Sequence, residues 1–144
     1  MEEKSIKIKI LYTIPNFDTA GSGKALLNIA TRLDTDIYEP HIASLHNRGE
    51  LFDMVRASNI PFHIFNFIHP MIPRMNGFKA CLKISNTFKT ISPQIIHSFN
   101  YSADYSEPFA AKITGIPWVY TKKNMNWGGS SSNAWKIRTL LATH

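Results

Sequence analysis

The sequence predicts an α/β domain built on a parallel sheet, and two observations lead to this expectation. Segments typical of strands and segments typical of helices alternate along the whole chain. Prolines recur one or two residues before the expected strands, where proline ends a helix and fixes an extended backbone; they are Pro40, Pro61, Pro93 and Pro117. Such alternation is typical of right-handed βαβ units, whose helices cover both faces of the sheet. We therefore expect a Rossmann-like, doubly wound, three-layer α/β/α fold with a parallel sheet of about five strands.

The strands are expected where β-branched and aromatic residues gather. In residues 6–13, Ile alternates with Lys before the pattern becomes continuously apolar, which predicts the first and longest strand. Shorter strands are expected at residues 41–45, 62–67, 95–99 and 118–121.

The helices are expected where apolar residues recur at helical spacing. Four of them follow the i, i+3, i+4, i+7 pattern of one helical face; they are Leu26, Ile29, Ala30 and Leu33. This pattern predicts a helix over residues 24–34. Further helices are expected at residues 50–58, 78–91, 108–114 and 132–143, with Gly115 as the C-terminal cap of the fourth helix.

Length and composition point to one folded domain over residues 1–144. Hydrophobic residues make up 44% of the chain and charged residues 18%, which excludes a disordered chain. The one cysteine, Cys81, excludes a disulfide scaffold and a cysteine zinc site and is typical of a reducing compartment. The N-terminus has no signal-peptide pattern, and no apolar run approaches the roughly 20 residues of a membrane span. We therefore expect a cytoplasmic location.

The net charge of +6 is unevenly distributed. Residues 1–53 carry six basic and eight acidic side chains, whereas residues 54–144 carry ten basic and two acidic ones. In sheets of this class, ligands bind beyond the carboxyl ends of the strands, where helix N-termini favour anions. Six basic residues fall in the loops expected there, at residues 14–23, 46–49, 68–76, 100–105 and 122–131; they are His46, Arg48, His69, Arg74, Lys122 and Lys123. We therefore expect an anion-binding edge.

A glycine-rich segment precedes the first expected helix. Gly21 and Gly23 allow a ligand to approach the backbone closely, and Ser22 is suited to cap the helix. A Walker A loop would need Gly at position 18 and Ser or Thr at position 25, where the chain has Asp18 and Ala25. A dinucleotide-binding fingerprint would need Gly at position 26, which is Leu. A Walker A loop and a dinucleotide-binding loop are therefore both weak interpretations of this segment.

Four segments, taken in order, carry a resemblance to a known family. They are residues 18–30 (DTAGSGKALLNIA), 36–45 (DIYEPHIASL), 92–100 (SPQIIHSFN) and 110–121 (AAKITGIPWVYT). In this order the chain resembles the N-terminal, acceptor-side domain of GT-B-fold glycosyltransferases of family 4, the retaining group 1 enzymes. The resemblance covers nearly the whole chain.

The resemblance implies a two-domain enzyme that moves a sugar from a nucleotide-diphosphate sugar to a glycan or a lipid-linked acceptor, as in polysaccharide biosynthesis. The C-terminal donor domain would lie outside this chain, which would be inactive alone. By analogy, Gly21, Ser22 and Gly23 form the donor-phosphate loop. Residues of the sugar and acceptor cleft are then Asn100, Tyr101, Lys122, Lys123 and Asn124. The chain departs from the family in one place, since Lys123 or Asn124 stands where a His is common.

The resemblance leaves the catalytic residues unknown, and we expect no metal and no cofactor besides the donor substrate. We expect valine at Gly21 or Gly23 to lower turnover of the full enzyme with little loss of fold. The alternative function is a stand-alone Rossmann-like module that binds an anionic, phosphorylated ligand. A nucleic-acid partner is not expected, because the chain lacks a clustered Arg and aromatic face.

Two further features have interpretations that the sequence leaves open. The segment 68–75 is apolar for a loop, so it covers the acceptor cleft, makes a peripheral contact with a membrane surface, or folds back onto the domain. His41, His63 and His97 fall within expected strands, where a structural role is the ordinary one.

Overall fold

The computed structural model describes residues 6–18, 20–69, 74–100, 105–121 and 133–142. Within these ranges strands and helices alternate in the order β1 (Ile8–Thr13), α1 (Ala20–Ala30), β2 (Tyr38–Ser44), α2 (Phe52–Ala57), β3 (Phe62–Ile64), α3 (Arg74–Ile91), β4 (Ile95–Ser98), α4 (Ser106–Thr114), β5 (Trp118–Tyr120) and α5 (Asn133–Ala142). The five strands form one sheet in the order β3-β2-β1-β4-β5, with every neighbouring pair parallel. The expected doubly wound α/β/α fold is confirmed.

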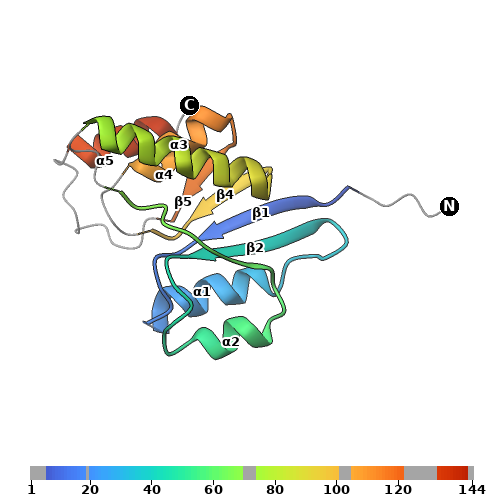
Figure 1. The fold of residues 1–144 in the computed structure, drawn as a ribbon. Coiled ribbons are helices and arrows are strands. Elements are labelled where there is room, and N and C mark those ends of the chain that lie inside the picture. The colour runs from blue at the N-terminus through green and yellow to red at the C-terminus, as the bar shows by residue number, and fades with distance from the viewer. Residues whose placement is uncertain (1–5, 19, 70–73, 101–104, 122–132, 143–144) are drawn as a thin grey trace.

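The sheet is covered on both faces. Helices α1 and α2 lie against one face, and α3, α4 and α5 lie against the other (Figure 1). The chain builds outward from β1 through β2 to β3 and then crosses back to β4, on the opposite side of β1. The strand order therefore reverses between β1 and β4, and this reversal makes the carboxyl ends of these two strands the switch point where ligands of such sheets bind.

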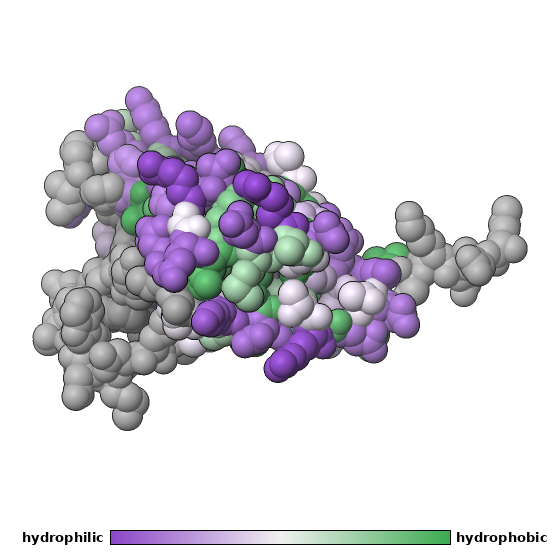
Figure 2. Space-filling view, turned by 90° about the horizontal axis from the view of Figure 1, so that it is seen from below, coloured by the Kyte–Doolittle hydropathy of each residue, from purple (hydrophilic) through white to green (hydrophobic). Residues whose placement is uncertain are grey.

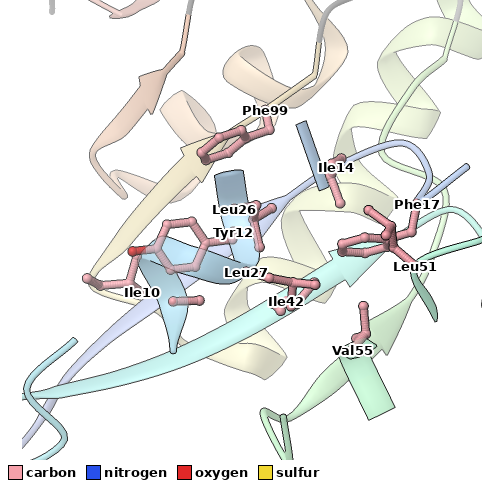
Figure 3. Packing of buried hydrophobic residues seen from close by; sticks show 11 residues of the cluster. Ile10, Tyr12, Ile14, Phe17, Leu26, Leu27, Ile42, Leu51, Val55 and Phe99 are labelled. Atoms are coloured by element: carbon pink, nitrogen blue, oxygen red, sulfur yellow. The ribbon is translucent and has the colours of Figure 1, made fainter. Parts of the chain in front are cut away.

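Two apolar clusters fill the space between the layers. The α1 and α2 side contains Tyr12 from β1, Ile42 from β2, Leu26 from α1 and Val55 from α2, which meet in one cluster (Figure 3). The opposite side contains ten buried residues, among them Leu11. Because β1 is buried on both faces, its residues 11–13 are all buried, which explains why its sequence ends as a continuous apolar run.

The outer surface over α1 and α2 is mostly hydrophilic. Viewed from the side of these helices, charged and polar residues surround a small central area of apolar ones (Figure 2). Exposed apolar side chains on these helices include Ile29 of α1 and Met54 of α2. Such scattered exposure is ordinary for a surface helix and does not by itself indicate an interface.

Several element boundaries differ from the sequence expectation, including the ends of α1 at Ala30 and of β3 at Ile64, and three starts differ most in their consequences. Helix α1 begins at Ala20 instead of residue 24, and α3 begins at Arg74 instead of residue 78, so Arg74 belongs to a helix and not to a loop. Strand β2 begins at Tyr38, which places Pro40 inside the strand, opposite Ile10 of β1.

Proline is tolerated in β2 because of where β3 begins. The N–H of Ile42 donates across β2's outer edge to the carbonyl of Pro61 at 2.9 Å. Strand residues two apart face the same neighbour, so the nitrogen of Pro40 also faces the β3 side. Pairing with β3 starts only at Ile42, so no ladder hydrogen bond is lost there.

Candidate functional site

The residues that follow β1 and β4 form the centre of the candidate site. We call residues 14–18 and 99–100, together with the first turns of α1 and α4, the switch-point edge. The N–H of Phe99 donates to the carbonyl of Thr13 at 2.7 Å, so the chain leaves β1 and β4 side by side. Of the predicted cleft residues, Tyr101, Lys122, Lys123 and Asn124 lie outside the described residues.

The segment after β1 is fastened to the end of β2. The carbonyl of Pro15 accepts hydrogen bonds from the hydroxyl of Ser44 at 3.1 Å and from the N–H of Leu45 at 3.2 Å. The N–H of Asp18 donates to Oδ1 of Asn16 at 3.2 Å, which closes a local turn. These bonds hold the backbone that leads into α1.

The glycine-rich segment lies inside α1 and not in a loop before it. Ser22 is the third residue of the helix, so it does not stand at the N-cap position where the sequence placed it. The first four N–H groups of a helix have no partner within the helix, and α1 has no acidic side chain in its first turn to neutralise their partial positive charge. Gly21 is exposed, and a Cβ at this position would meet nothing within 4 Å. Among the described residues, therefore, nothing blocks the approach of an anionic ligand to Gly21 at the start of α1.

Gly23 has a packing role that the sequence did not reveal. It is buried, and a Cβ there would lie 2.8 Å from Cδ1 of Leu51 and 2.9 Å from Cδ1 of Phe17. Phe17 is fully buried, so its ring has little room to shift. The two glycines therefore differ, and a larger residue at Gly23 disturbs the packing of α1, whereas one at Gly21 does not.

A third glycine, Gly49, was not singled out from the sequence. Its φ of +131° is unfavourable for other residues, and a Cβ there would lie 2.6 Å from the carbonyl carbon of Phe17. The neighbouring N–H of Leu51 donates to the carbonyl of Phe17 at 3.2 Å. The loop after β2 thus closes directly onto the backbone of residues 14–18. In the sequence Gly49 resembles any glycine in a turn, because its role depends on this long-range contact.

A buried carboxyl group lies beneath the switch-point edge. Glu107 is fully buried in the first turn of α4. It accepts hydrogen bonds from the hydroxyl of Thr13, from the hydroxyl of Ser98 at 3.0 Å and from the indole N–H of Trp118 at 3.3 Å. These three donors belong to β1, β4 and β5, so a single side chain joins α4 to three strands. The sequence offered one signal for it, since Glu107 is one of only two acidic residues after residue 53.

Two further residues at this edge, Asn100 and Ser106, are also held by hydrogen bonds. Asn100, a predicted cleft residue, is buried, and its N–H donates to the hydroxyl of Ser98 at 3.2 Å. The hydroxyl of Ser106 donates to the carbonyl of Phe67 and accepts from the N–H of His69, both at 3.1 Å. The start of α4 is thereby tied to the segment after β3.

The described basic residues of the expected edge all follow β2 or β3. His46 and Arg48 lie in the loop after β2, where the N–H of Arg48 donates to Nδ1 of His46 at 3.3 Å. His69 lies after β3, and Arg74 is the first residue of α3. None of these four described basic side chains therefore belongs to the segment that follows β1.

The three strand histidines make structural contacts. Nε2 of His41 donates to Glu39 at 2.7 Å, and its Nδ1 shares a hydrogen bond of 2.8 Å with Nε2 of His63, whose ring stacks on it. Nε2 of His97 lies 2.9 Å from the hydroxyl of Thr121. Burial, with a smaller effect from His41, lowers the pKa of His63, and burial lowers the pKa of His97. The described residues contain no group of three or more His, Cys, Asp or Glu side chains suited to a metal ion.

Comparisons with solved structures identify proteins of the same fold. No protein-family model and no curated protein matches the sequence. MurG from Acinetobacter baumannii superposes with a TM-score of 0.67 and 15% identity, over 94% of this chain and 40% of MurG. Alr3699/HepE from Anabaena, in complex with UDP, has a TM-score of 0.64 and 17% identity, over 94% of this chain and 35% of HepE. UDP-GlcNAc 2-epimerase from Neisseria meningitidis, bound to UDP-GlcNAc, has a TM-score of 0.59 and 13% identity, over 94% of this chain and 39% of the epimerase.

At these identities the likeness shows a shared fold. The chain spans between 35% and 40% of the length of the three proteins, so it corresponds to one part of each of them.

Alanine substitutions at Gly21 and Gly23 should change the free energy of unfolding differently, because Gly21 is open and Gly23 is packed. We expect Gly21→Ala to leave the free energy of unfolding unchanged or to raise it by up to about 1 kcal/mol, because alanine favours a helix. Gly23→Ala should lower it by about 1–3 kcal/mol, because its Cβ would crowd Leu51 and Phe17. Urea unfolding followed by circular dichroism measures both values. Equal stabilities of the two variants would contradict the assigned packing role of Gly23.

The half-buried histidines His63 and His97 should make the fold sensitive to mild acid. Since the pKa of His63 and of His97 is lowered from 6.5 in the folded protein, the unfolded chain binds more protons as the pH falls. Their contribution to stability is complete above about pH 7 and is lost as the pH falls through 6.5 toward the lower folded values. We expect the urea midpoint to fall between pH 7.5 and pH 5.5, and to fall less in the double variant His63→Gln, His97→Gln. The same fall in both proteins would assign the effect to other groups.

Proposed function

We propose that the protein is the acceptor-binding N-terminal domain of a glycosyltransferase, which moves a sugar from a nucleotide-diphosphate sugar to a glycan or lipid-linked acceptor. The observation that carries the proposal is the open first turn of α1 at the switch-point edge. The fold shared with the glycosyltransferases MurG and HepE supports it, and the complex of HepE with UDP supports a nucleotide donor. A stand-alone anion-binding module is less well supported by these likenesses.

Epimerisation of a nucleotide sugar is a second candidate activity, because an epimerase shares the fold. The likeness to UDP-GlcNAc 2-epimerase extends over as much of this chain as the likeness to MurG. The four sequence segments that resemble family 4 enzymes favour transfer over epimerisation. The same proposal includes three points that rest on the sequence. They are membership of that retaining group, a role in polysaccharide biosynthesis and a cytoplasmic location.

In this proposal the first turn of α1 receives the donor's diphosphate. Its backbone N–H groups and the helix dipole stabilise the negative charge that develops on the leaving phosphate, and they do so without reorganisation because α1 is packed in place. Gly21 leaves the approach open, and Gly23 keeps the helix close to Phe17. A C-terminal domain would supply most of the remaining donor contacts.

The acceptor side of the proposal concerns the segments after β4 and β5. In the sequence, Asn100 and Tyr101 come after β4. Lys122, Lys123 and Asn124 come after β5, with Thr121 in between. Since parallel strands end at the same edge of the sheet, the ends of β4 and β5 lie on the side proposed for the donor's diphosphate. The contact of these residues with the sugar or the acceptor stays a prediction.

The deciding experiment compares two valine variants on α1 in an enzyme that contains both proposed domains. We expect Gly21→Val to lower turnover with a nucleotide-diphosphate sugar at least tenfold, because the side chain would block the approach to the helix N–H groups. Ala25→Val is the matched control, since Ala25 is exposed one turn further along the same helix. Circular dichroism verifies that both variants fold.

Two outcomes would refute the proposal, one from this comparison and one from an assay of residues 1–144 alone. Full activity of Gly21→Val would remove the first turn of α1 from the donor site. Sugar transfer by residues 1–144 alone would overturn the two-domain account, since we expect this chain by itself to be inactive.

We also propose a peripheral contact between α3 and a membrane that carries the lipid-linked acceptor. Three apolar side chains are exposed at helical spacing on α3, namely Met75 at 72%, Phe78 at 50% and Leu82 at 40%. Cationic residues on the same three turns are Arg74, Lys79 and Lys83. Apolar and cationic side chains in this arrangement bind the surface of an anionic bilayer. Within the described residues no helix is long and apolar enough to cross a membrane.

Vesicle binding tests this contact. We expect the double variant Phe78→Ser, Leu82→Ser to co-sediment with phosphatidylglycerol-containing vesicles at least tenfold more weakly than the unaltered protein. Met54→Ser is the control, because Met54 is similarly exposed, at 51%, but lies on α2 on the other face of the sheet. Equal binding of all three proteins would exclude α3 as the contact.

A further inference from the structure

A groove runs along one side of α3, and none of its described lining residues belongs to α1. It has a volume of about 670 Å³ and lies between α3 and the residues that end and follow β3, including Phe65, Asn66 and His69. β3 pairs only with β2 in the described sheet, so the groove lies along the outer strand of that sheet. A volume of this size is typical of sites for small organic ligands, which occupy roughly 300–1,000 Å³.

The groove carries unneutralised positive charge. Lys79 and Lys83 line it, one helical turn apart on the same side of α3. No carboxylate is among its lining residues, and the one ion pair of the described residues joins His41 to Glu39, elsewhere in the structure. Two ammonium groups in this arrangement attract an anion, and a phosphate oxygen cluster can accept hydrogen bonds from both.

Polar side chains gather at the end of the groove near the start of α3. Asn66, Asn76 and His69 line this end. Oδ1 of Asn66 accepts the N–H of Ile68 at 3.0 Å, which leaves its NH₂ group as the part that a ligand can use as a donor. Donor groups beside two lysines match a phosphate better than they match a cation or an apolar molecule.

The floor of the groove is apolar and rigid. Ile84 is buried beneath it, and Ala80 lies beside it on the same helix. The ring of Phe65 forms the opposite wall and is held edge-on by two other rings, those of Phe67 at 5.6 Å and Phe88 at 6.0 Å between centroids. An inorganic phosphate would leave this wall in contact with water, whereas an apolar group attached to the phosphate would cover it.

From these features we propose that the groove beside α3 is a binding site for a phosphate ester that carries an apolar group, with the phosphate at Lys79 and Lys83 and the apolar group against Phe65 and Ile84. Both a lipid phosphate and a small phosphorylated metabolite contain a phosphate ester, and the apolar wall favours the lipid-like source. The site is separate from the one proposed for the donor's diphosphate at α1, so either can exist without the other.

Calorimetric titration with hexyl phosphate tests the site, with glucose 1-phosphate and inorganic phosphate as comparison ligands. We expect hexyl phosphate to bind at least tenfold more tightly than either, and amide NMR signals of Asn66, His69 and Asn76 to shift on binding. Lys79→Gln and Lys83→Gln should each weaken binding about tenfold, as expected for loss of a charge-assisted hydrogen bond. Lys89→Gln is the matched control, because Lys89 is exposed on the same helix but does not line the groove.

The remaining outcomes would overturn the proposal. Equal affinity for hexyl phosphate and inorganic phosphate would remove the role of the apolar wall, and tighter binding of glucose 1-phosphate would assign the site to a polar metabolite. Binding that shifts the signals of Gly21–Gly23 and survives both lysine substitutions would move the phosphate to α1. Equal weakening by Lys89→Gln would reduce the effect to the net charge of the helix. Absence of binding by the folded protein would exclude the site.

Discussion

The hydrogen bonds of the buried Glu107 side chain are the interactions on which the edge of the sheet at the strand ends depends. A buried carboxyl group is costly unless hydrogen-bond donors surround it. Thr13, Ser98 and Trp118 supply these donors from three different strands. Their convergence fixes β1, β4 and β5 relative to the start of α4. The segments that form the switch-point edge begin directly after Thr13 and Ser98, so their starting positions are set by this network.

Close backbone packing then shapes the entrance to α1. Gly49 and Gly23 allow the loop after β2 and the first turn of α1 to press against Phe17, which is fully buried between them. The start of α1 is therefore held by contacts on its inner side, while Gly21 on its outer side stays open. A helix N-terminus held in this way presents its N–H groups in a fixed direction, which is what electrostatic stabilisation of a phosphate requires.

The uneven charge of the chain has a spatial counterpart. The described basic residues of the expected edge follow β2 or β3 in the chain, whereas the open end of α1 follows β1. α3 combines exposed apolar side chains on one flank with a lysine-lined groove on the other. The same helix thereby carries side chains for two kinds of contact.

The order and type of every described element followed from local patterns, because alternation, helical spacing and proline positions act over a few neighbouring residues. The starts of α1 and α3 did not, since small or polar first turns have no apolar periodicity to mark them. The roles of Glu107, Gly23 and Gly49 were decided only by the tertiary structure. Their partners are distant in sequence, as with Thr13 and Glu107, which are 94 residues apart. The sequence by itself determined the sheet and the edge at which a ligand is expected, while packing between distant segments decided which of the described residues hold that edge and which leave it open.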